Sequence, residues 1–379
     1  MKNLHIVPNY FTHDSRVLKE TESLVDANLV KYAHIVSLHA HDLAFNETID
    51  SKRSVHRFPL FCRFLPKVLF FQVFKYIEFS IKCYIFSKKN KINIINIHHV
   101  VLLPIGVVLS KLCSAKLIYD THELETEIHG LNGFRKYCAK FLEHSLIRFP
   151  ELIIVVSDGI KSWYEDNYNR NNIVTVLNCP KYFNPVRSRV LHHELGLDHS
   201  KKILLYQGGL QTGRGIEGLL SIFSKWNDEQ YVIVFMGTGP LLDLVRKYSA
   251  NHSSIFLQPA APPDTVLKYT SSADVGISYI DNSSLNDYFC LPNKFFEYIM
   301  AGLPVIVNDV PEMRKIVEKF SIGHVASVLS TEEIKESLHV ISKMDKSKFN
   351  VDIIKARNTL CWEKQEEVML QAYNHFEIM

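Results

Sequence analysis

Short apolar runs that end in polar or glycine-containing turns recur along the whole chain. In the first half, residues 4–8 form such a run, and a polar loop then leads into residues 15–27, where apolar side chains recur at helical spacing. Five more strands are predicted in this half, at residues 33–39, 92–99, 116–122, 152–157 and 172–177. Helical stretches separate several of these runs, and this alternation predicts a parallel sheet covered by helices on both faces.

A second series of the same kind begins near residue 202. Its predicted strands cover residues 202–210, 231–239, 254–260, 273–279 and 303–309, and Gly, Pro or Asp closes each apolar run. Residues 181–202 keep no sustained period and contain Pro, Asn and Gly, which is typical of a linker. Since 379 residues are also too many for one ordinary open α/β domain, we predict two α/β lobes, the first ending near Lys181.

Composition narrows the class of protein. The chain is 47% hydrophobic and 22% charged, which predicts a folded protein. Its formal net charge of +3, from 43 basic and 40 acidic residues, gives no argument for a nucleic-acid partner. The seven cysteines are scattered and form no C-x-x-C pair, so neither a disulfide framework nor a zinc site is predicted, and a reducing cytoplasm is expected. The apolar run at the N-terminus is too short for a secretion signal, so secretion is not expected.

Residues 61–91 are too apolar for an ordinary surface helix and too interrupted by charge for a membrane span. Five polar residues share one helical stripe of this segment: Gln72, Lys75, Glu78, Lys82 and Lys89. Two interpretations stay open, namely helices packed within the first lobe and a basic, aromatic face that rests on the inner leaflet of a membrane. The flanking basic residues favour attraction to anionic lipid or to a phosphorylated acceptor.

Glycines mark two junctions between a strand and a helix in the second lobe. Gly208 and Gly209 close one predicted strand, and Arg214 stands between two further glycines where the next helix begins. Glycine lets backbone N–H groups approach a phosphate, while a guanidinium and the helix dipole neutralise its charge. A tight surface turn with a solvated arginine explains the same residues equally well. Gly237 lies in a second junction of this kind, which is a weak signal by itself.

The stretch "PNKFFEYIMAGLPVI", from Pro292 to Ile306, joins an amphipathic helix to a turn and a buried strand. Asn293 and Lys294 stand at the start of this helix, whose N–H groups can bind a diphosphate. Glu297, one turn later, can accept hydrogen bonds from both hydroxyl groups of a ribose. The alternative is that Glu297 only improves the helix dipole, a surface effect of about 0.3–1 kcal/mol.

A histidine among acids follows one predicted strand of the first lobe. The stretch "LIYDTHELETE" gathers Asp120, His122 and Glu123 at the end of that strand, and His98 and His99 end a neighbouring one. Such a histidine can transfer protons near neutral pH, and a carboxylate on its other ring nitrogen fixes its tautomer. Because the chain has 18 histidines, a structural role is the commoner explanation for any one of them, but the position of His122 favours catalysis.

The order and spacing of these stretches resemble those of GT-B glycosyltransferases, particularly the large retaining group called family 4. In that group a strand–Gly–helix unit places an Arg and a Lys on the donor diphosphate, and an E-x7-E segment before A-G-x-P binds the donor. The resemblance implies a ribose contact for Glu297. It implies further donor contacts at Gly208, Gly209, Arg214, Gly237, Asn293, Lys294 and Phe295.

Two positions depart from the pattern of that group. Phe289 stands where the first Glu of the segment would be, and Gly209 takes the place of the first phosphate-binding Arg. Recognition of the hydroxyl groups of the donor sugar would then fall to other residues. The candidates are Asp287, Asn286 and the backbone amides near Cys290.

The first lobe and the end of the chain carry the resemblance further. "YDTHE" matches a strand end that faces the anomeric carbon, which implies catalytic roles for His122 and Asp120, with Arg214 on the leaving group. "NYFTHDSRVLKE" resembles the opening loop and first helix of the group, where Arg16 is expected to pair with Glu20. The implied acceptor or cleft residues are Asn9, Tyr10, His98, His99 and Glu123. "TLCWEKQEEVMLQAY" resembles the C-terminal helix of the group.

The implied fold class is α/β, of the GT-B type. Two Rossmann-like lobes face each other across a cleft, with an acceptor lobe at 1–181, a donor lobe at 182–358 and a helix at 359–379 that crosses back to the first lobe. The implied reaction moves a sugar from a nucleotide diphosphate donor, UDP in preference to GDP, to a glycan or lipid-linked acceptor. Retention of configuration is implied, whereas inversion would need a base such as His122, Asp120 or Glu123. No metal and no other cofactor are expected.

Two other functions stay open at this stage. A sugar-nucleotide epimerase can share the two-lobed fold and the ribose-binding carboxylate. A non-catalytic partner of a glycosyltransferase is compatible with Phe289 and Gly209, because both stand where donor-binding side chains are usual.

Overall fold

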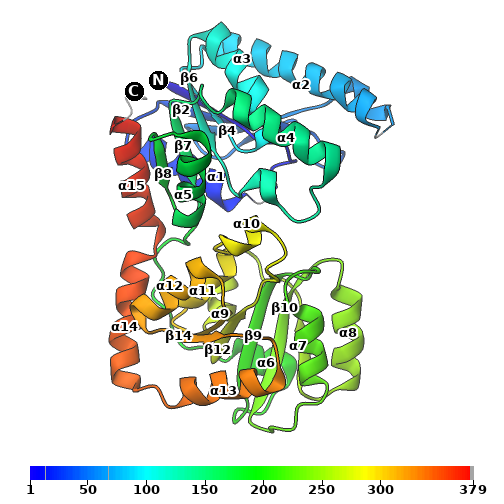
Figure 1. The fold of residues 1–379 in the computed structure, drawn as a ribbon, viewed down its shortest axis with the longest axis vertical. Coiled ribbons are helices and arrows are strands. Elements are labelled where there is room, and N and C mark those ends of the chain that lie inside the picture. The colour runs from blue at the N-terminus through cyan, green and yellow to red at the C-terminus, as the bar shows by residue number, and fades with distance from the viewer. Residues whose placement is uncertain (13, 67, 376–379) are drawn as a thin grey trace. The chain divides into compact units, whose positions relative to one another are not determined.

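The computed structural model describes residues 1–12, 14–66 and 68–375. The chain divides into two compact units (Figure 1). Unit 1 comprises Met1–Val176 and Glu366–Met379, and unit 2 comprises Leu177–Gln365. The sequence predicts the corresponding boundaries at residues 181 and 358.

The described part of unit 1 contains an eight-stranded sheet in the order β3-β4-β2-β1-β5-β6-β7-β8. Its strands are β1 (Lys2–Ile6), β2 (Tyr32–Leu38), β3 (Asn46–Thr48), β4 (Arg53–Phe58), β5 (Ile94–Ile97), β6 (Lys116–Asp120), β7 (Leu152–Val155) and β8 (Ile173–Thr175). Neighbouring strands are parallel, except that β3 is antiparallel to β4. Every residue of β5 and β7 is buried, as expected for strands of a parallel sheet with helices on both faces.

Helices connect these strands and cover the sheet. They are α1 (Ser15–Asp26), α2 (Leu69–Asn90), α3 (Leu103–Cys113), α4 (Gly133–Leu146) and α5 (Asp158–Tyr168), with short 3-10 turns at η1 (Phe61–Phe64), η2 (Val100–Leu102) and η3 (Glu125–Glu127). The end of α15 (Trp362–His375) also belongs to unit 1. It is anchored by Asn96 of β5, whose Nδ2 donates to the Tyr373 hydroxyl at 2.7 Å.

Six parallel strands form the sheet of unit 2 within the described residues, in the order β11-β10-β9-β12-β13-β14. They are β9 (Lys202–Gly209), β10 (Tyr231–Thr238), β11 (Ile255–Gln258), β12 (Val275–Ser278), β13 (Val305–Asn308) and β14 (Gly323–Ala326). The helices are α6 (Val190–Leu195), α7 (Ile216–Phe223), α8 (Leu242–Asn251), α9 (Val266–Thr270), α10 (Leu285–Tyr288), α11 (Asn293–Met300), α12 (Pro311–Phe320), α13 (Thr331–Ser342) and α14 (Lys346–Thr359). Two buried clusters of apolar side chains pack around this sheet.

Some elements differ from the prediction for physical reasons. The strands β3, β4 and β14 were not predicted, because β3 is exposed, β4 alternates with charged residues and β14 is short and only partly buried. The segment predicted as a linker belongs to unit 2 instead. It contains α6, in which Leu191 and His192 are buried. Among the described residues, no helix is both long and apolar enough to cross a membrane.

Candidate active site

Glycines open the carboxyl edge of the sheet in unit 2. Gly208 of β9 pairs with Gly237 of β10. A Cβ atom on Gly237 would lie 1.9 Å from the carbonyl oxygen of Gly208, so no larger residue fits. Gly208 has a φ of +106°, and a Cβ atom there would lie 3.8 Å from Cε of Lys294. The exposed Gly209 follows and ends β9. The strand end therefore lies against the side chain of Lys294 with no side chain of its own between them.

Lys294 is a buried cation at this edge. Only 9% of its surface is exposed, its Nζ has no hydrogen-bond partner, and Nζ lies 3.6 Å from the centre of the Tyr206 ring. Burial and the positive charge of Arg214 lower the pKa of Lys294 to about 7, against the opposing effects of Glu297 and Cys290. A bound anion would supply the hydrogen-bond acceptors that Nζ lacks.

Arg214 reaches the same place from a glycine turn. It is half-buried and stands between Gly213 and Gly215, whose φ angles are +82° and +70°. Gly215 caps the N-terminus of α7 in this left-handed conformation, which other residues adopt only with strain. Because Arg214 acts electrostatically on both Lys294 and Tyr206, the two cations share one site.

The N-terminus of α11 completes the cationic side of the site. No side chain caps this helix, which begins at Asn293 after an extended Pro292. Its dipole therefore adds to the charges of Arg214 and Lys294. Asn293 is partly engaged, since its Oδ1 accepts a hydrogen bond from Asn178 at 2.9 Å.

Glu297 is held in place by the strand beneath it. Gln207 Nε2 donates to Glu297 Oε2 at 2.5 Å, and Gln207 Oε1 accepts from the Thr270 hydroxyl at 2.7 Å. The hydroxyl of Tyr298 accepts from the Gln207 backbone N–H at 2.8 Å and donates to the Ile277 carbonyl at 3.2 Å. A half-buried carboxylate with such a fixed position can accept hydrogen bonds from a pair of neighbouring hydroxyl groups.

Two further residues of this region, Phe295 and Asp287, have side chains engaged within unit 2. Phe295 is fully buried in the core and its N–H donates to the Pro292 carbonyl at 3.0 Å, which corrects its prediction as a donor contact. Asp287 accepts hydrogen bonds from the hydroxyls of Ser283 and Ser284. Through Oδ2 its carboxylate therefore stabilises the start of α10.

In unit 1, three adjacent strands bring a buried polar cluster together. His5 lies on β1, His98 directly follows β5 and His122 stands two residues after the end of β6, and these strands are neighbours in the sheet. Nδ1 of His5 lies 2.8 Å from Nε2 of His98, and Nδ1 of His98 lies 3.0 Å from Nε2 of His122. His5 is fully buried and the side chain of His98 is 1% exposed, whereas that of His122 is 29% exposed.

Asp120 is the anion of this cluster and is fully buried. Arg16 donates to its Oδ1 from Nη2 at 2.7 Å and to its Oδ2 from Nε at 3.0 Å. Burial alone would raise the pKa of Asp120, but the charges of Arg16 and His122 outweigh it and hold that pKa well below its usual range. Burial and the charge of Asp120 raise the pKa of Glu20 well above its usual range.

These contacts revise two predictions. Arg16 pairs with Glu20 as predicted, with 3.0 Å between Nε and Oε1, but its main partner is Asp120. Asp120 and His98 are buried behind His122, so neither contacts a substrate directly. Only His122 of these residues has the exposure that such a contact needs.

The other predicted acceptor residues lie nearby in the chain with different partners. Nδ1 of His99 lies 3.0 Å from Oε2 of Glu125, and although burial opposes it, this contact raises the pKa of His99. Glu123 is exposed. Asn9 is exposed and its Oδ1 accepts from the Phe11 N–H at 2.8 Å, while Tyr10 is 46% exposed. These four residues are not part of the buried cluster.

The cluster has a donor set that suits a cation, since His98 Nδ1, His122 Nε2 and Asp120 Oδ2 lie within 4.8 Å of one another. The guanidinium of Arg16 already contacts the same carboxylate oxygen, and it supplies the positive charge that a metal ion would bring. We therefore assign no metal to these residues, and the prediction of a metal-independent protein stays a prediction.

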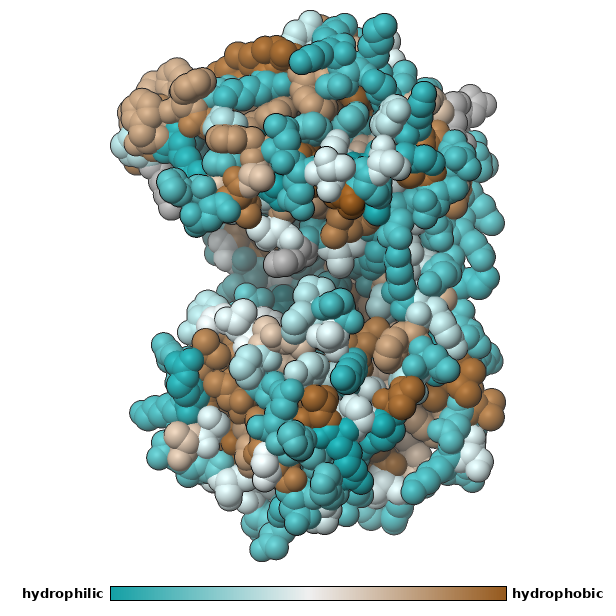
Figure 2. Space-filling view, turned by 180° about the vertical axis from the view of Figure 1, so that it is seen from behind, coloured by the Kyte–Doolittle hydropathy of each residue, from teal (hydrophilic) through white to brown (hydrophobic). Residues whose placement is uncertain are grey.

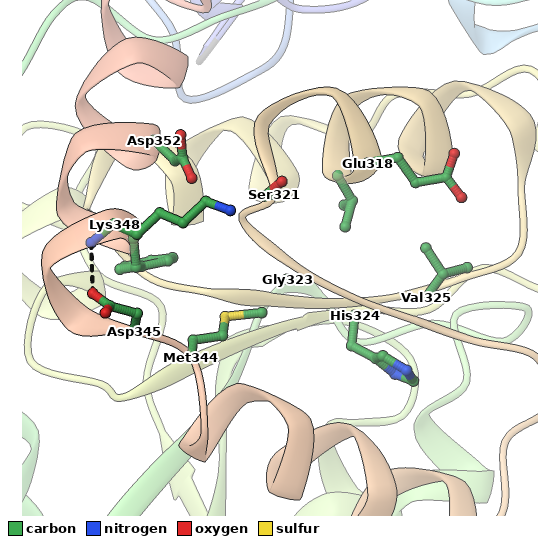
Figure 3. A pocket seen from close by; sticks show the side chains of 11 residues that line it. Glu318, Ser321, Gly323, His324, Val325, Met344, Asp345, Lys348 and Asp352 are labelled. Carbon is green, nitrogen blue, oxygen red and sulfur yellow. Dashed lines mark hydrogen bonds between the residues drawn. The ribbon is translucent and has the colours of Figure 1, made fainter.

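A pocket of about 640 Å³ lies elsewhere in unit 2, between α12, β14 and α14 (Figure 3). The side chain of Lys348 extends into it, and the Lys348 N–H donates to Asp345 Oδ1 at 2.9 Å. Ser321 and Gly323 place this pocket at the amino end of β14. Ligands in open parallel sheets bind beyond the carboxyl ends of the strands, so the pocket is not part of the candidate site.

One protein family matches the part of the chain that contains the cationic site. Residues 188–357 match the family described as Glycosyl transferases group 1. This part of the chain is therefore similar to that family. All the donor-site residues discussed above lie in this glycosyl transferases group 1 domain, whereas His122 and its cluster lie outside it. The match covers less than half of the chain, and the likeness to the solved structures described next shows the GT-B fold for the whole of it.

Solved structures share the whole fold at low sequence identity. Sucrose-phosphate synthase from Thermosynechococcus elongatus has a TM-score of 0.79 at 15% identity, over 99% of each chain. HepE from Anabaena in complex with UDP-glucose has a TM-score of 0.73 at 12% identity, over 100% of each chain. A glycosyltransferase from Rickettsia africae has a TM-score of 0.71 at 13% identity, over 99% of this chain and 98% of that one. No curated protein sequence matches the chain.

Proposed function

We propose that this protein transfers a sugar from a nucleoside diphosphate sugar, with UDP favoured over GDP, to a glycan acceptor of a polysaccharide or a lipid-linked oligosaccharide. The observation that carries the proposal is the convergence of Arg214, the buried Lys294 and the uncapped N-terminus of α11 at one strand edge. The preference for UDP is supported by the UDP-glucose bound to HepE, which has the same fold.

The cationic side of the site suits the leaving group of this reaction. When the bond between the sugar and the diphosphate breaks, negative charge grows on the departing phosphate. Arg214, Lys294 and the α11 dipole stabilise that charge more in the transition state than in the bound donor, which lowers the barrier. These groups supply the charge that a metal ion supplies in other transferases, and we propose a reaction without one.

Glu297 and His122 take the two remaining roles. Glu297 is held in position by Gln207. It accepts hydrogen bonds from the hydroxyl groups of the ribose and so selects a nucleotide. We propose His122 of unit 1 as a catalytic residue and a transfer with retention of configuration.

An exposed apolar surface on unit 1 suggests where the acceptor is met. Exposed apolar residues of three helices make up this surface, which we call the apolar surface. They are Phe70, Val73, Phe74, Ile77, Ile81 and Ile85 of α2, Val108 and Leu112 of α3, and Phe134, Tyr137 and Phe141 of α4. The three helices contact one another in the order α2, α3, α4. Figure 2 shows apolar side chains gathered at the upper edge of unit 1, over the region of α2.

Part of the polar stripe of α2 is half-buried against the preceding segment, namely Lys75, Glu78 and Lys82. Glu78 accepts from the N–H groups of Phe61 and Cys62 in η1 at 2.8 and 2.9 Å, and Lys75 donates to the Leu65 carbonyl at 2.8 Å. Phe79, Cys83 and Ser87 of α2 are buried within unit 1, whereas Phe70 and Phe74 are exposed.

Basic residues are exposed on the same helices as the apolar surface. Those exposed on the three helices are Lys88, Lys89, Lys111, Arg135 and Lys140. Exposed apolar side chains together with lysine and arginine are typical of a surface that rests on anionic lipid. We therefore propose peripheral contact with the cytoplasmic leaflet, which would bring a lipid-linked acceptor to the enzyme.

Thermal unfolding with a panel of nucleoside diphosphates and their sugars tests the proposed function. A ligand at 100 times its dissociation constant adds about 2.7 kcal/mol to the free energy of unfolding. We expect this stabilisation from UDP and from at least one UDP-sugar, and its loss in the Lys294→Met variant. Absence of any shift across UDP, GDP, ADP and CMP compounds would contradict the proposal.

A further inference from the structure

Three imidazoles of unit 1 lie in a row that ends at the partly exposed His122. The row runs from the fully buried His5 through His98 to His122, with 2.8 Å and 3.0 Å between the facing nitrogens. The sequence marks His122 as a candidate, but it says nothing of a second and third imidazole in contact with it. A neutral imidazole carries its proton on only one of its two ring nitrogens, so each histidine of the row has one of two tautomers.

Asp120 determines that pattern. Oδ2 of Asp120 lies 3.1 Å from Nδ1 of His98 and 3.2 Å from Nε2 of His122. Arg16 donates two hydrogen bonds to this carboxylate, and an ionised carboxylate only accepts. Both nitrogens that face Oδ2 therefore carry protons, since an unprotonated nitrogen would place its lone pair against an anion. The 3.0 Å between His98 Nδ1 and His122 Nε2 is then a contact between two donors that share Oδ2, and not a hydrogen bond.

The protonation of the other ring nitrogens of His98 and His5 follows from these two assignments. With its proton on Nδ1, His98 has a lone pair on Nε2, and this accepts a hydrogen bond from Nδ1–H of His5. Nε2 of His5 then keeps a lone pair, in agreement with its lack of a hydrogen-bond partner. Burial lowers the pKa of both His5 and His98, so both are neutral.

We infer that Asp120 holds His122 in the tautomer with the proton on Nε2, and that His98 is the positioning residue that keeps this arrangement from behind. His122 then presents an unprotonated Nδ1, which can accept a hydrogen bond from a sugar hydroxyl. His98 cannot accept a proton from His122 through Nδ1, because that nitrogen already carries one. The inference rests on the proposed function for the chemistry of His122, but not for its tautomer.

Nitrogen NMR on the full-length protein, labelled with ¹⁵N-histidine, tests the tautomer without any activity. The resonances of His122 are identified by their loss in His122→Gln, at about pH 8.5, where an ordinary imidazole is neutral. We expect Nδ1 in the range of unprotonated ring nitrogens and Nε2 in the range of protonated ones. The opposite assignment would overturn the inference.

A matched pair of variants tests the role of His98. The amide nitrogen of Asn stands where Nδ1 of histidine stands, and that of Gln stands where Nε2 stands. His98→Asn keeps the donor toward Asp120, and His98→Gln loses it. We expect His98→Gln to lower sugar transfer about 10- to 100-fold, the scale seen when an orienting partner is lost, and His98→Asn to retain most of the activity.

The melting temperatures of both variants separate positioning from folding. Equal loss of activity and equal loss of melting temperature in the two variants would show a merely structural role and overturn the inference. A wild-type protein that neither binds nor turns over nucleotide sugars would contradict the proposed function, and the NMR assignment would still decide the tautomer.

Discussion

Lys294 is the residue whose chemistry departs most from its ordinary behaviour. A buried ammonium with no hydrogen-bond partner is costly, and the protein reduces the cost by lowering the pKa of this side chain to about 7. Tyr206 offers only the face of its ring, at 3.6 Å from Nζ. A diphosphate would restore both a counter-charge and acceptors, so Lys294 should gain a proton when the donor binds.

This proton uptake predicts a pH-dependent affinity for UDP. Above pH 7 the free protein loses the Lys294 proton, whereas the complex keeps it, so affinity falls as pH rises. The dissociation constant should increase by up to about tenfold per pH unit between pH 7 and 9. Calorimetry at several pH values measures this, with Lys294→Arg as the control, since arginine stays charged throughout. A dissociation constant for wild type that is constant over this range would refute proton uptake.

Glu297 gives a second prediction at the same scale. Glu297→Ala should weaken UDP binding by about 1–3 kcal/mol, because it removes charged acceptors from the ribose hydroxyls. The fold should survive, since the carboxylate is only half-buried. Calorimetry with UDP and with 2′-deoxy-UDP checks the mechanism: the variant should no longer distinguish the two. An unchanged affinity would remove Glu297 from the ribose site.

The sequence predicts part of this chemistry and misses another part. Arg214 and Glu297 are placed by local signals, because a glycine turn and a helix start are defined by neighbours in the chain. The burial of Lys294 is set by Tyr206, which is 88 positions away and adjacent only once β9 and α11 pack. His5 was missed because it lies within an apolar run, where a polar residue in a strand interior was the only available signal.

At the scale of elements, α2 is the helix whose surroundings the sequence could not decide. Its hydrophobic residues are numerous enough to predict burial. In the structure, however, Glu78 and Lys75 of its polar stripe form hydrogen bonds with Phe61 and Leu65. The apolar surface on α2, α3 and α4 is left exposed. Residues on α4 were not part of the prediction, because helices that lie side by side in space are separated in sequence.

This surface predicts binding to anionic vesicles. The protein should sediment with vesicles that contain phosphatidylglycerol and much less with phosphatidylcholine alone, since each basic residue near such a surface contributes about 1 kcal/mol. Replacing Phe134, Tyr137 and Phe141 by serine should weaken binding at least tenfold without changing UDP affinity. Equal sedimentation with both kinds of vesicle, or no effect of the triple variant, would argue against a membrane surface.

At the scale of the whole molecule, the buried ion pair of unit 1 ties distant parts of the chain together. Arg16 joins α1 to Asp120 at the end of β6 and also donates to the carbonyl of Val176 at 2.8 Å. Arg16→Met should lower the free energy of unfolding by about 3–5 kcal/mol, because it leaves the Asp120 charge buried without its partner. Denaturant unfolding measures this loss.

The double variant Arg16→Met, Asp120→Leu is the matched control for that loss. It removes both charges, so it should recover much of the stability, as replacement of a buried pair by apolar residues often does. A double variant as unstable as Arg16→Met would show that packing, not charge, explains the effect.

The alternation of strands and helices in the sequence predicts both sheets of the molecule, because buried parallel strands are continuous apolar runs. It misses β4 and β14, whose residues are only partly buried. The resemblance of short motifs supplies the GT-B fold, which the family match and the solved structures confirm. Local patterns do not specify which side chains meet from separate strands, so the histidine row required the structure.

Release of nucleoside diphosphate from a panel of nucleotide sugars tests the central claim most directly. The wild-type protein should release UDP from at least one UDP-sugar, and His122→Ala should lower the rate about 100-fold or more while the dissociation constant for UDP stays the same. Absence of release from every sugar tested, or a His122→Ala protein that is destabilised but fully active, would contradict the assignment of this chain and of His122 to sugar transfer.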